Sequence, residues 1–408
     1  MAVRYRSYLE VGPRDFDAVV VGAGLAGSVV ARELAERTGM RVLVLEKRPR
    51  IGGNLSDGYN DDGILVHHYG PHVFHTSDER VIAYMKRFAR WRPYEHCVLA
   101  NWYGTYLPVP FNRTSLEIAF GHDRSRELFA RLCEVFGEGA EITVGELLSC
   151  DDDGLREVGE FVYKNVFSYY SEKQWGVPAD EVDERIIGRV PVRISNDDRY
   201  FTDSFQGVPV EGYTCFFESL LGHDNITVCL DMEAENAFDL VFESGEATSP
   251  LSSIKVKDRA FTGPIVYTGP LDELFLSRFG RLPYRSIDFA FETIEREHVL
   301  PCGTVNFTVT EDYTRMTEFT WLTGQHSQRT TVVREYPCAY EDAYTQVPCY
   351  PIINDANLAH YEQYRSFTAT LPNFHPMGRL AEYRYYDMDA VVARALQLAD
   401  QLCENNAI

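Results

Sequence analysis

The chain has 408 residues, of which 45% are hydrophobic and 25% charged, and its formal net charge is −22. This length and composition are typical of a folded protein with roughly two or three cooperating domains. The negative charge argues against general binding to nucleic acid or an anionic membrane, and no apolar run approaches the ~20 residues that span a bilayer. An anionic substrate would need local arginines to reverse the field of the chain.

The nine cysteines are an odd number and form no CxxC pair. They therefore predict neither a disulfide framework nor a thiolate metal site. Residues 1–13 are polar and charged, without the apolar stretch of a secretory signal, and we interpret them as a frayed extension. We expect a reduced, cytoplasmic protein.

The first predicted elements form a βαβ unit. Residues 18–21 are apolar and predict a strand buried on both faces of a parallel sheet. A helical pattern follows until Gly39, which can cap the helix. A second β-rich run over residues 41–45 ends on an acidic side chain.

A glycine-rich turn joins this strand to the helix with the spacing Gly22-x-Gly24-x-x-Gly27. Gly22 permits the turn, Gly24 lets the backbone approach a pyrophosphate, and Gly27 allows close packing of the helix. Glu46 follows the second strand, where a carboxylate can hold a ribose 2′-hydroxyl. An ordinary βαβ unit does not require all these features in this order, so the stretch predicts dinucleotide binding.

A second glycine pair, Gly52-Gly53, follows Lys47 and precedes Asn54. Such a pair lets a loop pass close to phosphates, although a plain turn would also explain it. With the first motif, it resembles the extended FAD signature of the glutathione-reductase-like superfamily, which includes the amine oxidases. This resemblance favours FAD over NAD as the bound dinucleotide.

Four histidines lie within residues 67–75 and invite a metal-site interpretation. No cysteine or carboxylate set accompanies them at ligand spacing, so we predict no metal and interpret them as structural histidines around a cofactor pocket. Residues 69–76 resemble the flavin-facing loop of UDP-galactopyranose mutases.

The pattern changes after this loop. Residues 98–109, with Tyr103-Gly104 at their middle, predict a hairpin, and residues 115–174 have helical spacing. The helical segment is expected to be a small domain inserted into the flavin-binding chain. Its end carries many aromatics, which suggests function, although packing of a hydrophobic helix end would also account for Phe167 and Tyr169.

Residues 185–201 contain many charged side chains, interrupted by a glycine and a proline. This pattern suggests a surface loop that can move. Residues 224–230 and 265–270 return to parallel-strand character, and β-rich runs between residues 287 and 334 have the spacing of an antiparallel sheet. Gly378 precedes a predicted helix start. The N-terminus of a helix favours negative charge, so this position suits the N1–C2 carbonyl region of a flavin.

The predicted fold is α/β, with a discontinuous FAD-binding Rossmann-like domain, an inserted helical bundle and an antiparallel β-sheet domain. The FAD-binding segments are expected at residues 14–96, 206–283 and 351–408. The β-sheet segments are expected at residues 97–111, 185–205 and 284–350, and the helical bundle with a mobile substrate loop at residues 112–184.

The familiar catalytic signatures GxSxG and HExxH and a reactive-cysteine motif are absent from the sequence. The chemistry is therefore expected to belong to the cofactor, with the protein supplying orientation and charge.

Six motifs resemble, in the same order, those of the UDP-galactopyranose mutase family over nearly the whole chain after Asp15. They are Gly52-Gly-Asn54, Tyr69–His75, Tyr170–Trp175, Arg189–Arg193, Tyr313–Arg315 and Gly378–Leu380 continued by Tyr385–Asp387. The resemblance implies an FAD-dependent isomerase that interconverts UDP-galactopyranose and UDP-galactofuranose with no net redox change. In that family the N5 atom of reduced flavin attacks the anomeric carbon, UDP leaves, and the flavin–sugar adduct allows the ring to reclose at the other size. It also implies an unidentified reductant, such as NAD(P)H, and a homodimer, which is common in the family.

The resemblance further implies residue roles. Catalytic roles fall on Arg189, Arg315, His75 and Trp175. Cofactor contacts fall on Gly22, Ala23, Gly24, Ala26, Gly27, Glu46, Lys47, Gly53, Asn54, His68, Tyr69, Arg379, Asp387 and Met388. Substrate contacts fall on His96, Val166, Phe167, Tyr170, Ser171, Trp175, Arg189, Tyr200, Arg315, Tyr350, Arg379, Tyr385 and Asp387.

These residue types suit the implied reaction. A departing diphosphate requires guanidinium donors, because arginine offers a planar bidentate fork, and Arg189 and Arg315 would supply them. Three tyrosine hydroxyls would donate to the diphosphate region, and Tyr170, helped by Phe167, would stack on uracil. Taken singly, each has an ordinary structural explanation as a surface ion pair, a core aromatic or a loop histidine.

Two positions depart from the commoner family pattern. His96 lies where many relatives carry an asparagine that contacts the nucleotide, and Val166 replaces an aromatic at the uracil end. The uridine contacts are therefore expected to differ in detail.

Two other functions fit parts of the sequence. A substrate-oxidising FAD enzyme, such as an amine oxidase or desaturase, would share the N-terminal motifs. A non-catalytic binding module resembling the GDP-dissociation inhibitors would keep the dinucleotide fold without using flavin.

Overall fold

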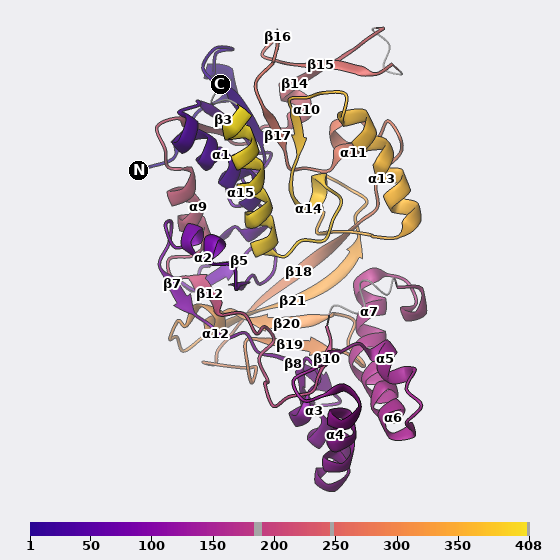
Figure 1. Cartoon of the computed structure of the whole chain (residues 1–408). Helices are drawn as coiled ribbons and strands as arrows, with labels where there is room; N and C mark the ends of the chain where they lie inside the picture. The colour runs from indigo at the N-terminus through magenta and orange to yellow at the C-terminus, as the bar shows by residue number, and fades with distance from the viewer. Residues whose placement is uncertain (183–189, 245–248, 406–408) are drawn as a thin grey trace.

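The computed structural model describes residues 1–182, 190–244 and 249–405. Figure 1 shows a parallel sheet with its helices at one end of the molecule, a long antiparallel sheet in the middle, and helices α3 to α7 at the other end. Among the helices of the described residues, none combines the length and apolar character that a membrane crossing requires.

A six-stranded parallel sheet forms the first layer. Its strand order is β1 (Arg4–Tyr5), β13 (Ile226–Cys229), β3 (Val42–Leu45), β2 (Ala18–Val21), β17 (Ile265–Tyr267) and β23 (Phe374–Pro376). All residues of β2, β3 and β17 are buried, which confirms the prediction of a strand buried on both faces over residues 18–21. Alternate side chains of β2 and β3 enter two separate hydrophobic cores, one on each face of the sheet.

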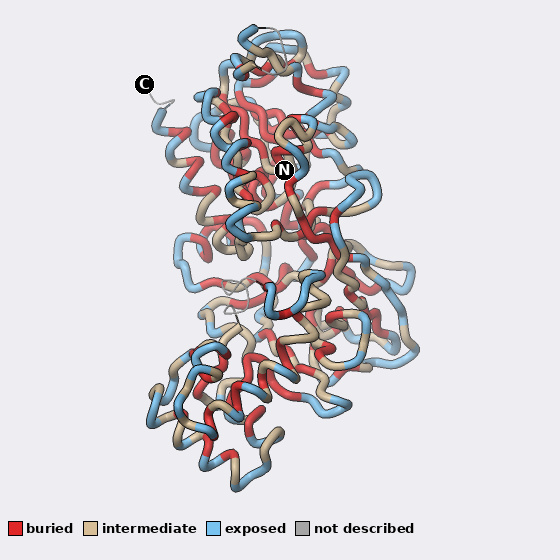
Figure 2. The backbone as a smooth tube through the Cα atoms, turned by 90° about the vertical axis from the view of Figure 1, so that its right-hand side faces the viewer, coloured by how far each residue is buried: buried red, intermediate tan, exposed pale blue. Residues whose placement is uncertain are grey.

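Two helices from opposite ends of the sequence cover one face of this sheet. Helix α1 (Leu25–Thr38) follows the glycine turn, and α15 (Met388–Asn405) lies beside it (Figure 1). The αL residue Gly39 caps α1, as predicted. Figure 2 shows buried stretches of the chain in the interior of this part of the molecule as well as in the other parts.

The N-terminal residues are part of the fold, so the expectation of a frayed extension is wrong. Arg4 and Tyr5 pair in parallel with Thr227 and Val228 of β13, and Val11 is buried in a core. Two paired residues with exposed side chains carry no apolar pattern, which is why the sequence did not reveal this edge strand.

The antiparallel sheet has seven strands. Their order is β22 (Tyr350–Pro351), β18 (Tyr284–Ile294), β21 (Thr330–Ala339), β20 (Arg315–Glu318), β19 (Thr304–Phe307), β8 (Val98–Trp102) and β9 (Thr105–Val109). All neighbours are antiparallel except β19 and β8. The predicted hairpin over residues 98–109 is confirmed, and Tyr103 and Gly104 both have positive φ angles, as its two-residue turn requires.

The third part of the molecule is helical and packs on β8 and β9. It contains α3 (Arg113–Phe120), α4 (His122–Phe136), α5 (Val144–Leu148), α6 (Asp153–Val162) and α7 (Ser168–Trp175), and residues of α3 to α6 share one hydrophobic core. A π-helical turn over Tyr163–Phe167 joins α6 to α7, and the sequence pattern gave no sign of it.

The remaining elements connect these parts. The strands are β4 (Asp57–Tyr59), β5 (Leu65–His67), β6 (Phe74–Thr76), β7 (Trp91–Pro93), β10 (Glu141–Ile142), β11 (Val192–Arg193), β12 (Phe205–Pro209), β14 (Phe238–Phe242), β15 (Leu251–Val256) and β16 (Arg259–Ala260). The helices are α2 (Glu79–Met85), α9 (Tyr213–Leu221), α10 (Ala234–Ala237), α11 (Leu271–Leu274), α12 (Phe319–Thr323), α13 (Asp355–Thr368) and α14 (Gly378–Ala381).

Candidate functional site

A cavity of about 660 Å³ opens at the carboxyl ends of the parallel strands. Its wall takes residues from the ends of β2, β3 and β17 and from the segments that follow β13 and β23. Ligands of open α/β sheets bind at this edge, where neighbouring connections leave in opposite directions.

Gly22 and Gly27 of the first predicted phosphate loop, and Gly53 of the second, are sterically required. A Cβ atom on Gly22, whose φ is +101°, would lie 2.0 Å from Thr268 Oγ1, and one on Gly27 would lie 2.0 Å from the carbonyl oxygen of Gly22. A Cβ atom on Gly53 would lie 2.9 Å from the Cα atom of Gly24, so the two loops are in backbone contact. This bare backbone at the start of α1 fits the pyrophosphate of a dinucleotide.

Glu46 is held in the cavity wall by backbone amides. Its Oε2 accepts a hydrogen bond from Ala23 N at 2.8 Å, its Oε1 accepts one from Arg48 N at 3.0 Å, and the residue is 5% exposed. An ionised carboxylate has about four acceptor positions, so this carboxylate can also accept bonds from ribose hydroxyls.

Arg48 belongs to the same wall and was missed by the sequence analysis. Its Nη2 donates to Asn54 Oδ1 at 2.8 Å, and its guanidinium lies 4.4 Å from the centre of the Tyr69 ring. Within the described residues, its Nη1 is buried without a hydrogen-bond partner. Because buried donors are normally paired, this nitrogen indicates an oxygen acceptor on a ligand in the cavity. The sequence feature that could have identified Arg48 is its position two residues after Glu46.

Eight further predicted cofactor residues line the cavity, as expected. They are Gly22, Gly24, Ala26, Lys47, Gly53, Asn54, Arg379 and Met388. His68 contacts Ser56 and Arg50, and the histidine that lines the cavity is His72 rather than His75.

A second cluster, which we call the arginine–tyrosine cluster, adjoins the cavity at Arg379. The rings of Tyr350 and Tyr385 are stacked 5.6 Å apart at an angle of 4°, and the Arg379 guanidinium lies 5.0 and 5.1 Å from their centres. Arg379 donates to the carbonyl oxygens of Cys349 and Tyr386, which fixes its orientation. Trp175, at the end of α7, lies 6.3 Å from Tyr350.

Arg315, at the start of β20, completes this cluster. Its Nε donates to Glu335 Oε1 at 2.6 Å, and 28% of the Arg315 side chain is exposed against 2% of that of Glu335. Although burial opposes the charged form, the Glu335 carboxylate raises the pKa of Arg315 well above its ordinary value. Burial likewise raises the pKa of Tyr170 to about 12, and the charge of Arg315 opposes that rise. The Arg315 guanidinium is thus a charged group that interacts electrostatically with Tyr170 and Tyr350.

The predicted residues His75 and His96 lie together. His75 Nδ1 contacts Asp203 Oδ2 at 2.8 Å, and its ring stacks on Phe201 at 3.5 Å. Burial lowers the pKa of His96 to about 3, helped by the charges of Arg315 and His75. Its ring lies 5.6 Å from that of Tyr200, and its buried Nδ1 has no hydrogen-bond partner within the described residues.

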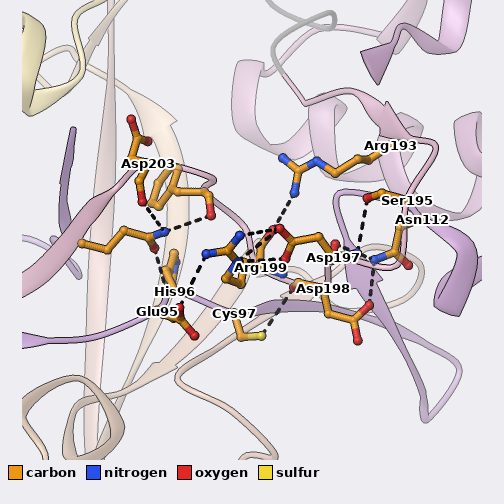
Figure 3. Close-up of polar contacts among 12 residues, drawn as sticks. Glu95, His96, Cys97, Asn112, Arg193, Ser195, Asp197, Asp198, Arg199 and Asp203 are labelled. Atoms are coloured by element: carbon orange, nitrogen blue, oxygen red, sulfur yellow. Dashed lines mark hydrogen bonds and ion pairs between the residues drawn. The ribbon is translucent and has the colours of Figure 1, made fainter. Parts of the chain in front are cut away.

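Polar contacts fix the segment that carries Tyr200 and Phe201 (Figure 3). Arg199 pairs with Asp197 at 2.7 Å and with Glu95 at 3.5 Å, and Arg193 Nη1 donates to the Arg199 carbonyl oxygen at 2.8 Å. Figure 3 also shows Asn112 donating to the Asp197 carbonyl oxygen, at 2.9 Å. In its described part, the predicted movable loop is therefore held at many points. The predicted catalytic residue Arg189 lies outside the described residues.

The uracil-end residues take mainly structural positions. Val166 and Phe167 belong to the core of the helical part, with exposures of 5% and 8%, and Ser171 is 8% exposed. Asp387 follows the cluster directly in sequence, two residues after Tyr385.

Comparisons with known proteins agree with this geometry. A family model described as UDP-galactopyranose mutase matches residues 165–385, and one described as an NAD(P)-binding Rossmann-like domain matches residues 20–88. A probable UDP-galactopyranose mutase of Klebsiella pneumoniae is 32% identical over 398 residues and 95% of both chains. The UDP-galactopyranose mutase of Mycoplasma genitalium is 33% identical over 96% of both chains, and a dTDP-fucopyranose mutase of Escherichia coli is 31% identical over 95% of this chain and 98% of its own.

A solved structure supports the fold. A crystal structure of reduced UDP-galactopyranose mutase superposes with a TM-score of 0.67 at 14% identity, covering 97% of this chain and 94% of that one.

Proposed function

Because the chain belongs to the UDP-galactopyranose mutase family, whose members are isomerases, we propose that it interconverts UDP-galactopyranose and UDP-galactofuranose with FAD as its cofactor. Reduced flavin, when bound, would supply the nucleophile for the anomeric carbon. The proposal also includes NAD(P)H or a similar reductant, a homodimer and a cytoplasmic location.

One observation carries this proposal: the arginine–tyrosine cluster directly adjoins the dinucleotide cavity, and Arg379 belongs to both. An enzyme that only oxidises a substrate does not need charged donors for a leaving diphosphate at this position. Arg315 has the required charge and orientation because Glu335 holds its Nε.

The roles of the chain's own residues follow from this arrangement. Arg315, together with Arg189, would bind the diphosphate and stabilise its charge as it departs. Tyr350 and Tyr385 would donate hydroxyls to the same oxygens. Tyr170 and Trp175 would face the nucleoside and the sugar.

The cofactor would be held by three separate segments, residues 14–96, 206–283 and 351–408. Strands β2 and β3 come from the first segment, β13 and β17 from the second, and β23 from the third. The last residues of β2, β3 and β17 line the cavity, and so do residues that follow β13 and β23. The β-sheet segments 97–111, 185–205 and 284–350 and the helical segment 112–184 would form the substrate side.

dTDP-fucopyranose is a second candidate substrate. The E. coli dTDP-fucopyranose mutase resembles this chain almost as closely as the UDP-galactopyranose mutases do. His96, which departs from the commoner pattern, would lie at the nucleotide end of the proposed site, whereas Val166, the other such position, is buried in the core of the helical part. A different base or sugar would be accommodated there while the diphosphate contacts stay the same.

The test is anaerobic incubation of the dithionite-reduced protein with UDP-galactofuranose and, separately, with dTDP-fucopyranose, with products resolved by chromatography. We expect conversion of UDP-galactofuranose to UDP-galactopyranose without consumption of an oxidant. No conversion of either sugar by protein that holds FAD would contradict the proposal. A colourless protein would favour a non-catalytic binding module, and stoichiometric oxidant use would favour a substrate-oxidising enzyme.

A further inference from the structure

Two elements carry three of the proposed substrate-binding residues. Helix α7 carries Tyr170 and Trp175, and the loop that connects β19 to β20 leads directly into Arg315. Residues 307–313, which comprise the last residue of β19 and most of the connection to β20, contact α7, so this contact lies between the proposed nucleoside-facing rings and the proposed phosphate-facing arginine.

Lys173 makes that contact. Its Nζ, on α7, donates three hydrogen bonds of 2.7 Å, to the backbone carbonyl oxygens of Phe307, Glu311 and Tyr313. An ammonium has three N–H donors, so all of them are used on one loop. Lysine on a helix surface ordinarily keeps its ammonium in water, which makes this arrangement a specific one.

Two further contacts hold the same helix. Thr308 Oγ1 donates to the Asn165 carbonyl oxygen at 2.6 Å, within the π-helical turn that precedes α7. At the other end, Arg285 donates to the carbonyl oxygens of Gln174 and Lys173 at 2.9 and 3.2 Å. A π-helical turn, such as the one that contains Asn165, leaves helix carbonyls available and is frequent at functional sites.

We propose that Lys173 is a positioning residue, which clamps loop 307–313 to α7 and so sets the separation of Tyr170 and Trp175 from Arg315. The identity of the ligand rests on the proposed function, whereas the clamp rests on the contacts above.

The environment of Lys173 gives the clamp a pH dependence. Burial lowers the pKa of Lys173 to about 8, and the carboxylates of Glu311 and Asp312 in the loop oppose that shift. The ammonium also lies 4.5 Å from the centre of the Tyr169 ring, a face that favours the charged form. Above this pH the neutral amine has two donors for three carbonyls, so the clamp weakens.

The first experiment measures binding of UDP by isothermal titration calorimetry to the flavin-loaded protein. Lys173→Met removes the donors at similar length and is expected to weaken binding about tenfold at neutral pH. The matched control is Lys164→Met, an exposed lysine on the preceding turn, which should bind UDP like the unaltered chain. Equal affinities for the two variants would overturn the clamp.

The variant Lys173→Arg tests whether the positive charge of the side chain, rather than its packing, holds the loop. Arg does not deprotonate, so Lys173→Arg should retain UDP binding at about pH 9, where the unaltered chain loses affinity. The same alkaline loss in both proteins would contradict the proposal.

Hydrogen exchange tests the clamp without any nucleotide. Amides of residues 307–313 should exchange faster in Lys173→Met than in Lys164→Met, and unchanged exchange would overturn the proposal. If Lys173→Met does not fold, Thr308→Val must show severalfold faster exchange of the same loop. Failure of the proposed function looks different: the unaltered chain would bind no UDP while its loop exchange still responded to Lys173.

Discussion

At the residue scale, Arg315 depends on one carboxylate for its orientation. Glu335 is almost fully buried, and one of its carboxylate oxygens accepts a hydrogen bond from the Arg315 Nε. The two terminal nitrogens of the guanidinium are therefore left to donate to an anion. The sequence motif Tyr313-Thr-Arg315 identified the arginine through its resemblance to a family. It could not identify Glu335, which pairs with Arg315 only across neighbouring strands β20 and β21.

Arg315→Ala should lower kcat/KM of the reduced enzyme by about 10²–10³-fold, because a charged donor to the departing diphosphate is lost. Arg189→Ala should have a comparable effect. Both variants should remain yellow. Arg315 is not among the residues that line the cofactor cavity, and the contact proposed for Arg189 is with the diphosphate of the substrate. Steady-state kinetics and the flavin absorbance spectrum measure this, and near-normal turnover in either variant would contradict the phosphate role.

Gly27→Ala should abolish most flavin retention. The new Cβ would lie 2.0 Å from the Gly22 carbonyl oxygen and 3.0 Å from Val20, so the phosphate turn must distort. The control is Gly145→Ala in α5, whose nearest neighbour would be 3.8 Å away. The flavin-to-protein absorbance ratio after purification is the measurement, and an equal ratio for both variants would refute the steric argument.

At the element scale, the predictions succeeded where a pattern is local. The hairpin over residues 98–109, the antiparallel runs and the helical segment all follow from spacing and turn residues within a few positions. The π-helical turn at Tyr163–Phe167 was missed, because its extra residue interrupts no polar–apolar pattern. Lys173 and Arg48 were missed because their partners lie in other segments of the chain, which local spacing does not reveal.

Asp57 in β4 determines how α9 begins. Its carboxylate accepts hydrogen bonds from the backbone amides of Tyr213 and Thr214, after Gly212 with its φ of +88°. Burial raises the pKa of Asp57, and these amides oppose that shift.

Asp57→Ala should lower the free energy of unfolding by about 3 kcal/mol, because the buried amide of Tyr213 and the half-buried amide of Thr214 lose their acceptor. Asp57→Asn should cost less, since its amide oxygen still accepts one of the bonds. Thermal unfolding of the purified proteins measures the difference, with exposed Asp61→Ala as the control. Equal melting temperatures for Asp57→Ala and Asp61→Ala would show that α9 does not need this cap.

At the scale of the whole molecule, buried neutral histidines link stability to pH. Burial lowers the pKa of His67, which is 1% exposed, to about 3, and similarly that of His72 and His96. The Nδ1 of His67 accepts a hydrogen bond from His72 N at 3.0 Å, a bond that protonation would destroy.

Because these folded-state pKa values lie below the unfolded value near 6.5, the unfolded chain binds more protons in acid. Stability should therefore fall as pH drops from about 6.5 towards 3, by about 2 kcal/mol at pH 5 for His67 alone. Melting temperatures at about pH 7 and pH 5 measure the effect. His67→Asn keeps an acceptor near the same place and should show a smaller loss between these pH values; an unchanged loss would exclude His67 as a contributor.

The segmented parallel sheet has a consequence for biosynthesis. Its edge strand β23 and the cavity residues Met388 and Val391 come from the last part of the described chain, whereas the phosphate turn comes from the first. Helix α15, which packs on α1, is translated some 350 residues after it. A nascent chain on the ribosome therefore lacks the partner of this face of α1 while the residues between the two helices are synthesised, and the cavity wall is completed only after α15 has emerged.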